Sequence, residues 1–146
     1  MPFLNIPHRL RLTTNGLVIR PTTYGQLAAL NHPLWRDEPP AAHRPRFHYF
    51  VVGREDDGAI VSSLDIEEVD DGSGTLSMSW ATISAEQQKG YASKSARRLI
   101  EWLFQQPGIN QIEIDIASEN EAKLKTANRI GFKRTAKPGR WRLRRE

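Results

Sequence analysis

The chain of 146 residues contains no cysteine. This absence excludes disulfides, thiolate metal sites and a cysteine nucleophile. The four histidines, His8, His32, His43 and His48, show no metal-ligand spacing, and we therefore expect no metal. Any chemistry must use other groups.

Long hydrophobic runs are absent as well. No apolar stretch reaches the roughly 18 residues that a membrane span needs, and residues 1–12 lack the apolar middle of a signal peptide. We therefore expect a cytoplasmic protein with no membrane partner. The chain length favours a single domain over residues 1–146 with one hydrophobic core.

Three catalytic signatures are also missing. The sequence contains no G-x-S-x-G nucleophile elbow, no Walker lysine and no H-E-x-x-H zinc pair. Serine hydrolases of the elbow type, P-loop nucleotide hydrolases and zinc proteases therefore find no support in the sequence.

Positive charge is in excess, with a net charge of +4. Residues 133–146 alone carry seven lysines or arginines against one acid, and Trp141 stands among the arginines. Such a cluster can hold a phosphate backbone, but no nucleic-acid recognition motif accompanies it. We interpret the segment as a solvated basic edge strand and do not expect a nucleic-acid partner.

Hydrophobic periodicity divides the chain into alternating elements. Apolar residues recur at helical spacing from Ala92 to Phe104, and they alternate with polar ones from Ile112 to Ile116. A loop with four prolines is expected at 31–46. The other expected elements are a strand at 16–21, a helix at 22–30, strands at 47–52, 59–66 and 75–83, a helix at 122–130, and closing strands at 132–135 and 140–144. This order predicts a mixed α/β (α+β) domain.

The junction from Gln87 to Ala92 is the most informative segment, because it connects a predicted strand to the strongest predicted helix. Backbone N–H groups at a helix start have no partner within the helix, and the dipole there is positive, so a diphosphate can bind. The alternative is that Gly90 only eases the turn into the helix. A second element follows it, with Asn120 after a strand and a helix ending at Gly131-Phe132.

Residues Trp80 to Ala92 resemble the pyrophosphate-binding motif Q/R-x-x-G-x-G/A of the GNAT superfamily of N-acetyltransferases. Asn120, followed eleven and twelve residues later by Gly131-Phe132, resembles the second cofactor motif of that superfamily. The resemblance runs from about Leu17 to the end and is closest to the ribosomal-protein N-terminal acetyltransferase branch. It implies a mostly antiparallel central sheet with a splayed strand pair and flanking helices.

The resemblance also implies what the protein binds and does. The acyl donor is acetyl-CoA, and the acetyl group moves by direct attack of a primary amine, either a protein N-terminus or a small amine. Relatives of this type are often monomers or homodimers. The implied donor-binding residues are Trp80, Ala81, Thr82 and Ile83 beside the thioester, Gln87, Gln88, Lys89, Gly90, Tyr91 and Ala92 at the pyrophosphate, and Asn120 and Lys123 on the other wall.

Two positions depart from the family pattern. Ala127 stands where many members carry a tyrosine that protonates the leaving thiolate, and Lys123 replaces a serine common in the favoured branch. Lys123 is a catalytic candidate, because a lysine can stabilise a thiolate or a phosphate. The alternative is that it is simply solvated. These departures leave a noncatalytic acyl-CoA-binding module as a second hypothesis.

The candidates for the general base are Glu113 and Asp115, which project from the same side of their predicted strand. The alternative is that both face solvent or a neighbouring cation. Asp65 and Glu67, at the end of a hairpin strand, are further candidates. The acceptor stays open: an acidic cleft would favour a polyamine or an aminoglycoside, and a neutral apolar cleft would favour a peptide end.

Overall fold

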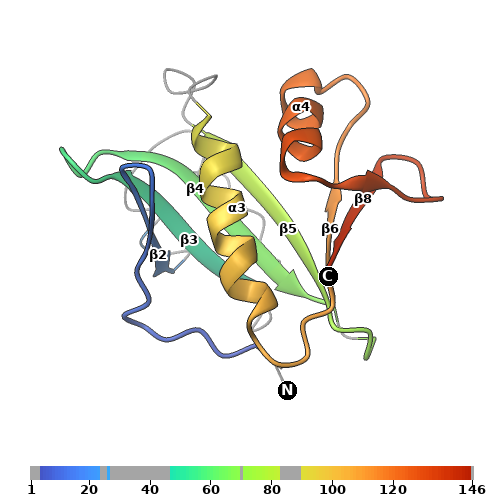
Figure 1. Ribbon diagram of the computed structural model, residues 1–146, viewed down its shortest axis with the longest axis horizontal. Helices are drawn as coiled ribbons and strands as arrows, with labels where there is room; N and C mark the ends of the chain where they lie inside the picture. Colours follow the sequence, from blue (N-terminus) through green and yellow to red (C-terminus); the bar gives the residue numbers. More distant parts are fainter. Residues whose placement is uncertain (1–3, 24–25, 27–46, 70, 83–89, 146) are drawn as a thin grey trace.

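The computed structural model describes residues 4–23, 26, 47–69, 71–82 and 90–145. In this part of the chain the strands form one eight-stranded sheet, ordered β1-β2-β3-β4-β5-β6-β8-β7 (Figure 1). The elements are β1 (Leu12–Thr14), β2 (Leu17–Thr22), β3 (Phe47–Arg54), β4 (Ile60–Glu68), β5 (Thr75–Thr82), α3 (Tyr91–Phe104), β6 (Gln111–Asp115), α4 (Glu121–Ile130), β7 (Lys133–Arg134) and β8 (Arg140–Arg144). The predicted mixed fold with a mostly antiparallel sheet is confirmed.

The sheet is antiparallel except between β5 and β6, which α3 connects as a parallel crossover. These two strands pair only where Thr75–Ser77 meets Gln111–Glu113. Strand β5 continues to Thr82 and β6 to Asp115 without further pairing between them. The expected splayed strand pair is therefore β5 and β6.

The hydrophobic core lies between the sheet and α3. The helix buries an apolar stripe that includes Ala96, Leu99 and Leu103, each fully buried, because these residues recur at the helical period. Sheet residues facing the core include Phe50 and Leu64. Burying such side chains contributes about 1.5–3 kcal/mol each.

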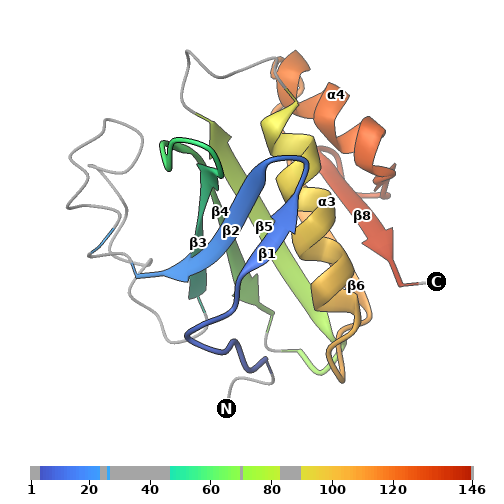
Figure 2. The same ribbon diagram turned by 60° about the vertical axis from the view of Figure 1, so that its left-hand side comes forward.

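Helix α4 lies beside α3 (Figures 1 and 2). The guanidinium of Arg97 on α3 donates a hydrogen bond to the carbonyl oxygen of Arg129 on α4, at 2.5 Å. Ala127 of α4 is fully buried. The two helices are therefore held in one fixed relation, with their first turns on either side of the open end of β5 and β6.

One strand was not predicted from the sequence, and another is shorter than predicted. Strand β1 pairs with β2 through Asn15-Gly16, where both residues have positive φ, as a two-residue hairpin turn requires. The closing strand expected at 132–135 is limited to Lys133–Arg134. Of the helix expected at 22–30, only residues 22, 23 and 26 are described, and Thr22 belongs to β2. The loop expected at 31–46 lies outside the described residues.

We predict that Leu99→Ala lowers the free energy of unfolding by about 2–5 kcal/mol, because it opens a cavity beneath α3. Urea unfolding followed by circular dichroism measures this loss. Glu101→Ala, an exposed change on the same helix, is the control and should shift the midpoint little. Equal midpoints for the two variants would contradict the assigned core.

Candidate functional site

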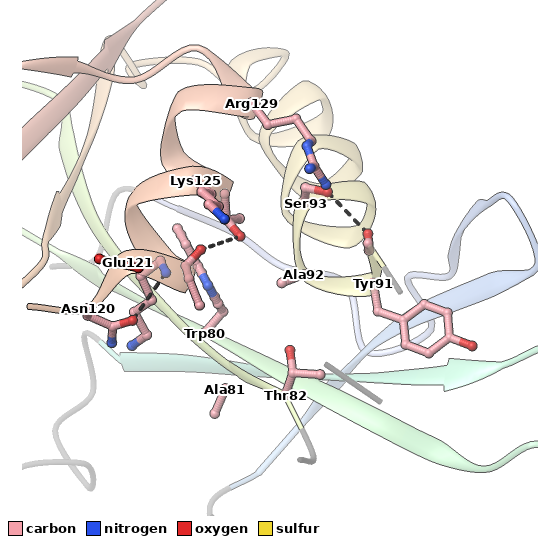
Figure 3. A pocket seen from close by; sticks show the side chains of 14 residues that line it. Trp80, Ala81, Thr82, Tyr91, Ala92, Ser93, Asn120, Glu121, Lys125 and Arg129 are labelled. Carbon is pink, nitrogen blue, oxygen red and sulfur yellow. Dashed lines mark hydrogen bonds between the residues drawn. The ribbon is translucent and has the colours of Figure 1, made fainter. Parts of the chain in front are cut away.

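A cavity of about 730 Å³ lies at the open end of β5 and β6, a size typical of small-molecule sites. In Figure 3, Asn120, Glu121, Lys125 and Arg129 line one wall, across from the start of α3. The full lining consists of Trp80, Ala81 and Thr82 from β5, Gly90 to Ser93 at the start of α3, and Asn120 to Lys123, Lys125, Thr126 and Arg129 around α4.

The first turn of α3 presents its backbone to this cavity. Gly90 is the N-cap residue, with φ 78° and ψ 10°, and no side chain in the described part of the chain caps the helix. A Cβ at Gly90 would meet nothing closer than 3.6 Å, so glycine is needed for the left-handed backbone and not for space. The uncapped N–H groups and the positive end of the helix dipole suit an anion.

Asn120 is the N-cap residue of α4. Its Oδ1 accepts a hydrogen bond from the backbone N–H of Lys123 at 3.2 Å, so one side-chain group has a structural role even though the residue also lines the cavity. The helix ends at Gly131, with φ 114°. Phe132 is buried beyond it as part of the core.

The other residues expected to bind the donor fall into two groups: those that line the cavity and those that the structure does not describe. Trp80, Ala81 and Thr82 line the cavity, together with Tyr91 and Ala92. Four of the expected residues lie outside the described part of the chain: Ile83, Gln87, Gln88 and Lys89.

Glu113 and Asp115 are engaged by the neighbouring strand. Arg142 Nη2 lies 2.6 Å from Glu113 Oε2, and Arg140 Nε lies 3.0 Å from Asp115 Oδ1. The hydrogen bond from Arg140 lowers the pKa of Asp115. Neither acid is among the residues lining the cavity. The geometry matches the alternative weighed above, in which both carboxylates face a neighbouring cation.

Asp65 on β4 has a different environment. It pairs in register with Ser79 on β5, and the Ser79 hydroxyl donates a hydrogen bond to its carboxylate. Burial raises the pKa of Asp65 above its ordinary value, whereas the Ser79 hydrogen bond and the positive charge of Lys123 act in the opposite direction. A carboxylate with a raised pKa holds a proton more readily at neutral pH.

Two cations of the cavity, Lys125 and Arg129, were not predicted as site residues. They stand four residues apart on α4, both are exposed, and both line the cavity. With Lys123 they make three positive side chains in the lining, against one acid, Glu121. The sequence signal was the basic spacing on the helix after Asn120, which a solvated helix face shows equally well.

The described ranges contain no group of three or more His, Asp or Glu side chains that could hold a metal ion. No helix in these ranges is both long enough and apolar enough to cross a membrane.

We predict that Asp65→Asn makes the protein more stable at pH 7. The folded pKa of Asp65 is raised, so its contribution to stability is complete below the unfolded pKa and is lost as pH rises through the folded pKa. The gain should vanish below about pH 4, as measured by urea unfolding across a pH series.

Asp115→Asn is the matched control, with the opposite sign. Its lowered folded pKa means that Asp115 contributes stability above its unfolded pKa and loses this contribution as pH falls through the folded pKa. The substitution should therefore destabilise at pH 7. A stability gain for Asp65→Asn that is the same at pH 4 and pH 7 would contradict the assigned environment.

Three solved structures with acetyltransferase activities in their names share this fold. A ribosomal-protein-S5-alanine acetyltransferase from Vibrio fischeri has a TM-score of 0.68 and 14% identity, over 85% of this chain and 83% of that one. An aminoglycoside acetyltransferase in complex with coenzyme A has a TM-score of 0.70 and 16% identity, over 88% and 95%. A dodecameric spermidine N-acetyltransferase from Vibrio cholerae has a TM-score of 0.67 and 17% identity, over 88% and 94%.

None of the curated proteins matches the chain. The family model for the acetyltransferase (GNAT) domain matches residues 16–133, which include β2 to β6, both helices and the lining of the cavity. The chain therefore belongs to the GNAT family of acetyltransferases.

Proposed function

We propose that this enzyme transfers an acetyl group from acetyl-CoA, bound in the cavity, to a primary amine that approaches from the Asp65 side of the sheet. One observation supports the proposal above all. The same cavity is lined by the first turn of α3, which begins at Gly90, and by three cations around α4. A diphosphate ester needs this combination of backbone donors and positive charge.

The donor fits the cavity at both of its ends. The first turn of α3 would hold the pyrophosphate, and Lys125 and Arg129 would add charge along the α4 wall. Beyond Ser77, the β6-facing main-chain groups of β5 have no strand partner among the described residues. They are available to hydrogen-bond the pantetheine arm and to polarise the thioester carbonyl.

We assign proton removal to Asp65 rather than to Glu113 or Asp115. The amine nitrogen forms a bond to the thioester carbon, the C–S bond breaks, and Asp65 takes the proton that the nitrogen loses. Asp65 is half-buried and its pKa is raised, whereas the other two acids are bound to arginines. A base with a raised pKa is better matched to neutral pH.

Lys123 has an electrostatic part in this proposal. Its positive charge, in the first turn of α4, would stabilise the leaving thiolate. Ala127 is fully buried and offers no acid, so solvent protonates the thiolate. Positioning of the amine and the thioester supplies most of the acceleration in such an aminolysis.

The acceptor we propose is a small cationic amine, with a protein N-terminus as the alternative. Asp65 and Glu67 lie two residues apart on one side of β4, opposite Tyr49 and Phe47 of β3. Carboxylates and aromatic rings together favour a ligand with more than one positive charge. The neighbouring structures include enzymes named for spermidine, aminoglycoside and protein acceptors, so the fold alone does not choose among them.

We predict that Asp65→Asn lowers kcat/KM by about 10²–10⁴-fold, the usual contribution of a general base. Release of CoA from acetyl-CoA is measured over a pH series with spermidine, an aminoglycoside and an alanine-terminated peptide as acceptors. The wild-type rate should rise as Asp65 ionises, and spermidine should be the best acceptor.

Glu67→Gln and Asp115→Asn provide the controls for this measurement. Glu67→Gln should raise the KM for spermidine and change the peptide reaction little, whereas Asp115→Asn should keep wild-type kcat with every acceptor. Transfer by Asp65→Asn at the wild-type rate and with the wild-type pH profile would rule out the assigned base.

A further inference from the structure

Lys123 differs from the other two cations of the cavity. Lys125 and Arg129 are exposed, whereas Lys123 is half-buried in the first turn of α4. Its backbone N–H is bound by the Asn120 side chain, which fixes where the lysine leaves the helix. The backbone from which the Lys123 side chain extends is therefore held in place in the cavity wall.

Burial raises the pKa of Asp65, and the positive charge of Lys123 opposes part of that rise. Asp65 stands on β4 opposite Ser79, so its side chain lies on the other face of the sheet from the neighbouring Trp80, which lines the cavity. The charge of Lys123 therefore acts on Asp65 on one face of the sheet. Its side chain lines the cavity on the other face. Lys123 lines the same cavity as Trp80, Ala81 and Thr82, the part of β5 that lies beyond its pairing with β6.

The amine of Lys123 is free to move toward a ligand. Within the described residues its Nζ has no hydrogen bond and no ion pair. In the proposed binding mode the thioester lies in the cavity that Lys123 lines. A primary amine held next to a bound thioester has a high effective concentration relative to one in solution.

We infer that Lys123 is a site of self-acetylation, modified by the acetyl-CoA bound in the same molecule when no acceptor amine is present. The neutral Nζ attacks the thioester carbon, the N–C bond forms and the C–S bond breaks. The proton that Nζ loses ends on the thiolate, so the products are one acetyl-lysine and one free CoA. This inference rests on the proposed function, because it needs acetyl-CoA in the cavity.

Self-acetylation would limit the enzyme in the absence of acceptor. It converts a cation into a neutral amide, which removes one of the three positive charges of the cavity lining. It also removes the positive charge that acts on Asp65. Acetylated enzyme should therefore bind acetyl-CoA more weakly and transfer acetyl groups more slowly than unmodified enzyme.

The test is to incubate the full chain with acetyl-CoA without an acceptor and to follow acetylation of each lysine by peptide mass spectrometry. We expect Lys123 to be acetylated at least about tenfold faster than Lys125 on the same helix and Lys133 on β7. Lys123 is half-buried in the cavity wall, whereas Lys125 is exposed and Lys133 lies outside the lining. Added spermidine or excess CoA should suppress this modification. Unfolded chain in urea should lose the preference.

Binding of acetyl-CoA is measured by calorimetry on the same preparation, so that the two proposals can fail separately. Lys123→Arg, which keeps the charge, should bind acetyl-CoA. The activity that this variant has at the start should stay constant during incubation with acetyl-CoA, whereas the activity of the wild type should fall. If acetyl-CoA binds and Lys123 is modified no faster than Lys133, the inference is overturned and the proposed function stands. If acetyl-CoA does not bind, both are overturned.

Discussion

The site depends on one short stretch of parallel pairing, between Thr75–Ser77 of β5 and Gln111–Glu113 of β6. Just before this pairing begins, the backbones of Gly74 and Gly108 lie close together. A Cβ on Gly74 would lie 2.3 Å from the carbonyl oxygen of Gly108, so only glycine fits. The backbone N–H of Asn110 donates to the Gly74 carbonyl at 2.8 Å. Because one end is fixed this closely, the lack of pairing further along opens the sheet at the other end, where both helices begin.

Charge is distributed on the two sides of this opening in opposite ways. The cavity side carries the α3 N-terminus and the cations of α4, which suit phosphates. The β4 side carries Asp65 and Glu67, which suit an amine. Two arginines of β8, Arg140 and Arg142, form ion pairs with acids of β6. Residues 133–146 carry seven lysines or arginines, and the charge of these two is balanced within the sheet.

Local periodicity was enough to predict α3 and β6. Apolar residues recur every 3.6 positions along α3 and at every second position along β6, and both patterns can be read from consecutive residues. The base candidates could not be settled in this way. Asp115 meets Arg140 across a strand pair that is separated by a helix and a turn in sequence, and only the register brings them together. Lys125 and Arg129 were missed for a related reason: a basic helix face becomes a cavity wall only once the helix is placed. Asn15-Gly16, by contrast, carried a hairpin signal that could have been found.

The most direct test of the account is calorimetric titration of acetyl-CoA into the wild type and two glycine variants. Gly90→Glu puts a negative charge at the start of α3, whereas Gly58→Glu makes the same change at an exposed glycine of positive φ in the hairpin between β3 and β4. The account predicts that the wild type and Gly58→Glu bind alike and that folded Gly90→Glu binds at least about tenfold more weakly, a loss of 1.4 kcal/mol or more. No binding by the wild type, or equal binding by the two variants, would contradict it.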